Sequence, residues 1–282
     1  MKFLSRLFKA IDLADTVVSI GEPYAWLVES GHKKILSIDD SEIGLQRTAR
    51  KLTNRVVGLA LSSGGTRGLA HIGVLQALVE ENIPIDLIAG SSAGALFGAL
   101  FTVGWDFERI KTYVQNLKTL THFTNWDLNI PPITGLVFDS GSLAEAIRAS
   151  ASIPILGDPW HYRGHFFVDG GVVNPLPANV LRERGADIVI ASNVVLPLNQ
   201  SYSGRKDKMP NILQLVFNIV SAFESELVKK QYPWIDVLIQ HHVSAKHTLD
   251  FDQAEYLIEI GAEETKKFIP DIKKLLADTV EI

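Results

Sequence analysis

The chain lacks cysteine, an excess of positive charge and any long hydrophobic run. Without cysteine, its 282 residues contain no disulfides, no thiol nucleophile and no thiolate metal site. The formal net charge of −5 gives no basic field that would hold nucleic acid. No apolar run approaches the roughly 20 residues of a membrane-spanning helix, and the N-terminus lacks the features of a secretory signal. We therefore expect a cytoplasmic protein with, at most, peripheral contact with a membrane surface.

The first 50 residues differ in pattern from the rest, which predicts a helical adapter segment, residues 1–50, and a large globular domain, residues 51–282. Within residues 1–15, apolar and basic side chains fall on different faces of a short helix. The apolar face has Leu4, Leu7, Phe8 and Ile11, and the basic side chains are Lys2, Arg6 and Lys9. Such a helix either contacts a membrane or packs on this protein or on a second copy, and the sequence leaves the oligomeric state open.

From Val56 onward, short apolar runs alternate with helix-compatible segments. Continuous apolar runs are typical of parallel strands buried on both faces. The alternation predicts an α/β fold with a mainly parallel sheet. The predicted strands are 56–61, 85–89, 165–168, 188–192 and 237–240, and the predicted helices are 41–54, 69–81, 93–103, 106–117, 143–149, 176–184, 212–229 and 254–268.

A G-x-S-x-G sequence at Gly90, Ser92 and Gly94 lies between a predicted strand and a predicted helix. Strand, sharp turn and helix in that order form a nucleophile elbow, which exposes the serine at the start of the helix. Free N–H groups and the helix dipole there favour developing negative charge. Ser92 is therefore a candidate nucleophile, provided that the rest of the chain supplies a base and an oxyanion hole.

The turn after the first strand is rich in glycine, with Gly64, Gly65 and Gly68 within residues 62–68. Glycines allow several main-chain N–H groups to point at one spot, as an oxyanion hole requires. The simpler interpretation is a tight turn between strand and helix. The glycine spacing excludes a dinucleotide-binding fingerprint, and the missing Gly-Lys-Ser/Thr excludes a P-loop.

A third motif, Asp169-Gly170-Gly171, follows the predicted strand 165–168. By itself Asp-Gly is more often a turn than a site, but all three motifs fall at the carboxyl ends of predicted strands, where open α/β sheets place their sites. Two bases for Ser92 remain open. One is Asp169 itself, because a partly desolvated carboxylate becomes more basic. The other is a histidine in the Ser–Asp–His order of α/β-hydrolases, and the candidates are His241, His242 and His247.

Taken together, residues 64–75, 90–94 and 169–177 resemble patatin-like phospholipases, with the three motifs in the family's order. The resemblance extends from about Val56 to the C-terminus and is strongest to the bacterial branch related to the catalytic domain of neuropathy target esterase. It implies a three-layer α/β/α fold in which residues 51–282 form the catalytic domain.

The resemblance also implies a Ser92–Asp169 dyad without histidine, cofactor or metal, and main-chain oxyanion donors at Gly64, Gly65 and Thr66. The residues that it assigns to motif support are Arg67, Gly68, Gly90, Gly94, Gly170 and Gly171. One position departs from the family, since Ser63 replaces its usual glycine. If that position needs a positive φ, serine costs on the order of 1 kcal/mol.

A patatin-like site accepts a fatty-acyl ester such as a phospholipid, a lysophospholipid or a simple carboxylic ester. Apolar residues within 119–160 are expected to line an acyl channel, although most such residues fill a core. They are Phe123, Trp126, Ile130, Ile133, Leu136, Val137, Phe138, Ile153, Ile155, Leu156 and Trp160. The alternatives to a dyad hydrolase are a catalytically weak lipid-binding or scaffolding protein on the same fold and a Ser-His-Asp triad esterase.

Overall fold

A computed structural model gives the structure of the protein, and the chain divides into two compact units, residues 1–56 and residues 57–282. The break lies six residues beyond the predicted boundary at residue 50, and the adapter role of the first segment stays a prediction. The described residues are 17–20, 35–38, 41–116, 136–153, 158–197, 212–243 and 253–278.

Within the described residues of the first unit, two short strands are followed by a helix. Strands β1 (Val17–Ile20) and β2 (Ile35–Ile38) pair in parallel. Helix α3 (Glu42–Leu52) begins where the Ser41 side chain accepts a hydrogen bond from the Gly44 N–H at 3.0 Å, which caps the first turn. The amphipathic helix expected within residues 1–15 lies outside the described residues.

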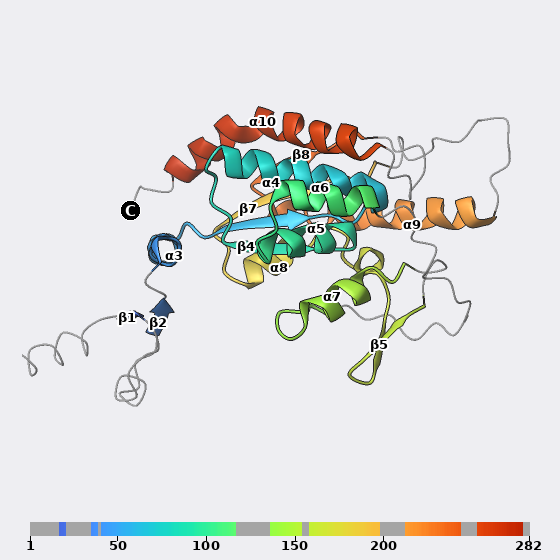
Figure 1. The fold of residues 1–282 in the computed structure, drawn as a ribbon, viewed down its shortest axis with the longest axis horizontal. Coiled ribbons are helices and arrows are strands. Elements are labelled where there is room, and N and C mark those ends of the chain that lie inside the picture. Colours follow the sequence, from blue (N-terminus) through green and yellow to red (C-terminus); the bar gives the residue numbers. More distant parts are fainter. Residues whose placement is uncertain are drawn as a thin grey trace, which may run out of the picture. The chain divides into compact units, whose positions relative to one another are not determined.

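The second unit is built on a sheet of four parallel strands in the order β4-β3-β7-β8 (Figure 1). Its strands are β3 (Val57–Leu61), β4 (Leu87–Gly90), β7 (Ile188–Asn193) and β8 (Val237–Gln240). All residues of β3 and β7 are buried, as the apolar runs of β3 and of residues 188–191 in β7 predict. The predicted α/β fold with a mainly parallel sheet is thus confirmed.

Helices cover both faces of this sheet, and the alternation of side chains along the strands assigns each face. Leu59 and Leu61 pack with residues of α4 and α10, whereas Ala60 packs with residues of α8 on the opposite face. Figure 1 shows α10 lying along α4 on one side of the sheet and α8 on the other. The helices are α4 (Ala70–Glu80), α5 (Ala93–Thr102), α6 (Phe107–Asn116), α8 (Ala178–Glu183), α9 (Ile212–Lys229) and α10 (Ala254–Asp278).

Two sequence predictions about this unit are wrong. Helix α10 does not end at Phe268 but continues past Pro270, because Ile269 and Ile272 pack into the main core and hold the helix in place despite the proline. The predicted strand 165–168 does not join the central sheet. It is β6 (His165–Phe167), which pairs antiparallel with β5 (Trp160–Tyr162) beside helix α7 (Leu143–Ser150).

None of the described helices combines the length and the apolar character needed to cross a lipid bilayer.

Candidate active site

Ser92 lies in the sharp turn between β4 and α5, directly before the first residue of that helix. Its backbone angles, φ 52° and ψ −117°, are unfavourable for a residue with a side chain, so the surrounding structure must hold it there. The flanking glycines make the turn possible. A Cβ on Gly90 would collide with the main chain at Gly94, and a Cβ on Gly94 would collide with the Leu61 main chain. The G-x-S-x-G sequence is therefore a nucleophile elbow in its geometry.

Asp169 is the side-chain partner of Ser92. The Ser92 Oγ donates a hydrogen bond to Asp169 Oδ2 at 2.6 Å, and Asp169 Oδ1 accepts one from the Gly171 N–H at 2.7 Å. Both side chains are buried, with 7% of Ser92 and 5% of Asp169 exposed. Burial raises the pKa of Asp169 to about 6, although the two hydrogen bonds oppose this rise. The carboxylate is thus a stronger base than an ordinary aspartate and is still ionised at neutral pH.

Asp169 reaches Ser92 from outside the central sheet, because it follows β6 rather than one of the four parallel strands. Its N–H donates to the Ser152 carbonyl at 2.9 Å. Close packing then requires glycine at the next two positions. A Cβ on Gly170 would lie 2.8 Å from Ser91 Oγ, and a Cβ on Gly171 would collide with Glu224 Oε1. The Asp-Gly-Gly sequence therefore allows the carboxylate to approach the elbow.

The glycine-rich turn after β3 lies against both other motifs. Its N-terminal part is anchored by the Ser63 N–H, which donates to the Pro175 carbonyl at 2.7 Å, and Arg67 donates through its N–H and its Nε to the Gly64 carbonyl at 3.2 and 3.4 Å. Gly65 has a φ of 55°, which favours glycine. Among the described residues, the hydrogen bonds that anchor the turn use the N–H groups of Ser63 and Arg67, not those of Gly64 and Gly65.

Two further residues fix this turn in place. Thr66 is fully buried in the short 3-10 helix η1 (Gly65–Leu69) that connects the turn to α4. A Cβ on Gly68 would collide with the Ala93 side chain, so the glycine allows η1 to pack against the start of α5. The turn and the elbow are therefore adjacent parts of one packed structure.

Ser63 does not carry the backbone strain that its replacement of glycine suggests. The described non-glycine residues with a positive φ are Asn54, Asn82, Ser92 and Arg163, so serine at position 63 needs no left-handed backbone. Its Oγ instead donates to Glu224 Oε1 at 2.7 Å, between two buried side chains. The condition for a strain penalty at Ser63, a positive φ, is therefore not met. The serine also has a hydrogen-bond partner that glycine would lack.

A cavity of about 60 Å³ lies beside Ser92 and Asp169, between the turn after β3 and α9. Gly64 and Gly65 line it on one side, and Glu224 lines it on the other. Sequence reasoning missed Glu224. A signal was present, because Glu224 interrupts the apolar face of α9 at four-residue spacing from Val220 and Val228.

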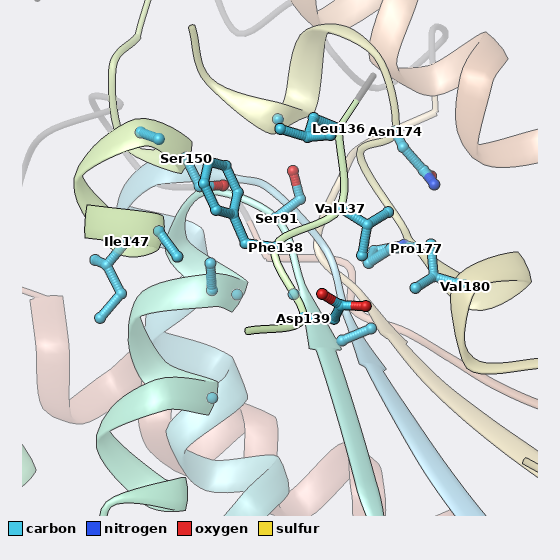
Figure 2. Close-up of a pocket in the computed structure, with 18 of the residues that line it drawn as sticks. Ser91, Leu136, Val137, Phe138, Asp139, Ile147, Ser150, Asn174, Pro177 and Val180 are labelled. Atoms are coloured by element: carbon cyan, nitrogen blue, oxygen red, sulfur yellow. The ribbon is translucent and has the colours of Figure 1, made fainter. Parts of the chain in front are cut away.

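A second cavity, of about 1330 Å³, is also lined by Asp169 and Gly170, and Figure 2 shows others of its lining residues. It extends along the edge strand β4 and the small residues of α5, and helix α7 lines it from the opposite side. Leu136, Val137 and Phe138 of the expected acyl channel line this cavity, whereas Ile153 lines the small one. Trp160 lines neither of these two. The other expected members lie outside the described residues: Phe123, Trp126, Ile130, Ile133, Ile155 and Leu156.

A Ser-His-Asp triad would need a histidine hydrogen-bonded to Ser92, so the contacts of the buried histidines matter. The fully buried His241 lies 3.0 Å from Ser192 Oγ through Nε2 and 2.6 Å from Glu264 Oε2 through Nδ1. His71 belongs to the same series of hydrogen bonds. Its Nδ1 lies 2.8 Å from Ser192 Oγ, and its Nε2 lies 2.9 Å from the Ser62 carbonyl oxygen. Neither ring is hydrogen-bonded to Ser92 in the described structure.

The acceptors in this series of hydrogen bonds determine which ring nitrogens carry a hydrogen. A carbonyl only accepts, so His71 Nε2 carries the hydrogen that the Ser62 carbonyl receives. Burial lowers the pKa of His71 to about 3, so its Nδ1 is bare and accepts from the Ser192 hydroxyl. Ser192 Oγ then accepts from His241 Nε2. Although burial opposes ionisation of Glu264, the hydrogen bond and charge of His241 hold its pKa below the usual value. His241 Nε2 therefore carries the hydrogen that Ser192 Oγ accepts, and its Nδ1 lies against the Glu264 carboxyl group.

The remaining triad candidates are His242 and His247. His242 is exposed, and His247 lies outside the described residues. The described residues also hold no group of three or more His, Asp or Glu side chains arranged to bind a metal ion. In the part of the chain that is described, the Ser92 hydroxyl therefore has a carboxylate partner.

Comparison with known proteins agrees with these motifs. The family model for patatin-like phospholipase matches residues 59–136 and 129–182, which include all three motifs. A patatin-like phospholipase domain-containing protein of Caenorhabditis elegans is 33% identical over 214 residues, covering 60% of this chain and 16% of that protein. An uncharacterized NTE family protein of Mycobacterium tuberculosis is 27% identical over 274 residues, covering 77% of this chain and 47% of that protein.

A lysophospholipase of Kluyveromyces lactis is 27% identical over 287 residues, covering 80% of this chain and 20% of the lysophospholipase. The chain thus spans less than half the length of these relatives. The resemblance found in the sequence is confirmed: the chain matches the patatin-like phospholipase family over residues 59–182 and is distantly homologous to NTE family proteins.

Proposed function

We propose that the protein is a serine hydrolase that cleaves fatty-acyl carboxylic esters through a Ser92–Asp169 dyad and an acyl-enzyme. The observation that supports this most directly is the 2.6 Å hydrogen bond from Ser92 Oγ to a buried carboxylate. The substrate class, a phospholipid, lysophospholipid or simple ester, follows from family membership and from relatives that are named lysophospholipases.

In the first half of the reaction, Asp169 accepts the Ser92 proton while Ser92 Oγ attacks the ester carbonyl. The negative charge that develops on the carbonyl oxygen is stabilised by main-chain N–H groups at Gly64, Gly65 and Thr66. When the tetrahedral intermediate collapses, the bond to the leaving alcohol breaks and the alcohol takes the proton from Asp169. In the second half, Asp169 takes a proton from water, which attacks the acyl-enzyme. The bond between the acyl carbon and Ser92 Oγ then breaks, Ser92 Oγ takes the proton back from Asp169, and the fatty acid is released.

The electrostatic properties of the dyad suit this role. A general base is most effective when its pKa lies near the working pH while it stays largely ionised. With a pKa of about 6, Asp169 is mostly ionised at pH 7 and is more basic than an exposed aspartate. Motif support comes from Arg67 and from the glycines that let the three motifs approach one another.

The acyl chain fits the larger cavity. Its lining is mainly apolar, it adjoins Asp169 and Gly170, and its volume of about 1330 Å³ exceeds the 300–1,000 Å³ typical of small-ligand pockets. Figure 2 shows Leu136, Val137 and Phe138 along one wall and Ile147 on another. These residues would bury the acyl chain of the ester away from water.

Residues 51–282 would form the catalytic domain, and residues 1–50 an adapter segment. Residues 1–15 would provide peripheral contact with a membrane through their apolar and basic side chains. Co-sedimentation with anionic liposomes tests this part. Binding that persists after residues 1–15 are deleted would contradict it.

Fluorophosphonate labelling, followed by mass-spectrometric mapping, tests the hydrolase itself. We expect a single adduct on Ser92 and at least a 10³-fold slower reaction in the Asp169→Asn variant. Folded protein that gives no adduct on Ser92 would contradict the proposal and favour a lipid-binding role. Ser63 carries no backbone strain, which supports the hydrolase rather than that second role.

A further inference from the structure

We infer that Glu224 is a positioning residue of this site: it ties the turn after β3 to the Asp169 loop, and its ionisation limits the reaction at alkaline pH. The inference deepens the proposed function and rests on it. Glu224 lies on α9, more than fifty residues beyond Asp169 and outside the three motifs.

One oxygen of Glu224 contacts both loops. The Ser63 Oγ donates to Glu224 Oε1 at 2.7 Å across 161 residues of sequence. The same oxygen lies so close to Gly171 that a Cβ there would collide with it. Gly171 in turn donates its N–H to Asp169. Glu224 therefore fixes the distance between the turn that holds the oxyanion donors and the loop that holds the base.

Two charged side chains, Arg67 and Asp169, lie near Glu224, and each comes from a different segment that packs against it. Arg67 of η1 attracts the carboxylate, Asp169 of the loop before the 3-10 helix η3 (Gly170–Val172) repels it, and all three side chains line the 60 Å³ cavity with Ser92. Burial raises the pKa of Glu224 to about 7, the Ser63 hydrogen bond opposes this rise, and the charge of Asp169 adds to it. Glu224 is thus neutral in the range where Asp169 becomes ionised.

These two ionisations have opposite effects on the reaction. Asp169 must lose its proton to act as the base, so the rate rises as pH passes about 6. Ionised Glu224 places a second negative charge in the cavity where the oxyanion forms, so the rate falls as pH passes about 7. The result is a narrow bell-shaped profile produced by two carboxyl groups, with apparent pKa values that belong to the pair.

The rate of fluorophosphonate labelling of Ser92 between pH 5 and pH 9 tests this profile. Glu224→Gln keeps an oxygen that accepts from Ser63 but is never charged, so we expect the acid limb to remain and the alkaline limb to disappear. Ser63→Gly removes the bond that favours the ionised form, so we expect the alkaline limb to move to higher pH. The matched control is Glu226→Gln, on the exposed side of the same helix, which should keep the wild-type profile.

An alkaline limb that persists unchanged in Glu224→Gln would overturn the inference, as would an equal change in Glu226→Gln. A second readout does not depend on activity. The carboxyl carbon-13 signal of Glu224, identified by its absence in Glu224→Gln, should titrate near 7 and move to lower pH in Asp169→Asn. Titration near the ordinary value of 4.5 would overturn the inference even if Ser92 reacts. Failure of Ser92 to react overturns the proposed function instead.

Discussion

The nucleophile and its base are held by two differently built regions. Ser92 follows a strand of the central sheet, and the glycines around it face main-chain atoms, Gly94 those of the neighbouring strand and Gly90 those at the start of α5. Asp169 follows a two-stranded hairpin outside that sheet, and the glycines after it face the side chains of Ser91, Ser150 and Glu224. The nucleophile is thus fixed by backbone packing, whereas the base is fixed by side chains that can move. Substitutions in the two regions should therefore behave differently.

The largest effect is expected at Gly94 on the sheet side. In Gly94→Ala the new methyl group would collide with the main chain at Leu61 and Ser62, which cannot rotate away. We expect about 3 kcal/mol lost from the free energy of unfolding. Gly170→Ala, on the hairpin side, meets only the hydroxyls of Ser91 and Ser150 and should lose about 1 kcal/mol or less. Urea unfolding of both variants measures the difference, and equal losses would contradict the comparison.

The next effect concerns the stability cost of the buried base. Because the folded state raises the pKa of Asp169 from 3.8 to about 6, folded protein binds more protons than unfolded protein between these values. Stability therefore falls as pH rises through this window, and the full cost is present above it. Asp169→Asn should be more stable than wild type at pH 8 by about 1–3 kcal/mol.

That gain should shrink as pH falls from about 6 to about 4 and should disappear at lower pH, where the wild-type carboxyl is protonated in both states. Urea unfolding at pH 4 and pH 8 measures it. The matched control is Asp271→Asn, at an exposed position on α10, which should show no such pH-dependent gain. If Asp169→Asn is no more stable than wild type at pH 8, burying the ionised Asp169 carboxylate does not lower the free energy of unfolding as we infer.

A smaller effect is expected where the two regions meet. The Ser92 N–H donates to Ser150 Oγ at 2.9 Å, so the end of α7 helps to hold the elbow from the hairpin side. Ser150→Ala leaves that N–H without this partner, and we expect kcat/KM to fall about 10-fold, since one hydrogen bond contributes roughly 1 kcal/mol. Ser140→Ala, on the exposed segment before α7, serves as the control. Equal rates in all three proteins would show that the sheet holds the elbow unaided.

The smallest effect is expected at the rim of the larger cavity. Leu136 is 61% exposed and lines that cavity, so Leu136→Asp should alter binding of long acyl chains without disturbing the core. We expect a several-fold loss of kcat/KM on long-chain esters, in line with roughly 0.8 kcal/mol for each apolar methylene group transferred from water, and little change on acetate esters. Rates on a chain-length series measure it, and parallel losses would contradict an acyl-binding role.

The sequence predicts the central sheet and the Ser92 elbow well, but it predicts the placement of the Asp169 hairpin poorly, for a physical reason. Strand β3 is apolar throughout and β7 is apolar from Ile188 to Ala191, as burial on both faces favours, and the elbow needs glycine at fixed positions. The strand before Asp169 was recognised, but a three-residue hairpin strand has no pattern that separates it from a sheet strand. Glu224 meets Ser63 across 161 residues, a contact that local patterns do not contain.

The buried chain of His71, Ser192, His241 and Glu264 has a consequence for chemical probes. Both imidazole rings are fully buried, and each ring nitrogen already has a partner. A reagent that acylates histidine therefore reaches these rings only after the core around them opens. Inactivation by such a reagent would report local unfolding or modification of exposed histidines, and would not by itself identify a catalytic imidazole.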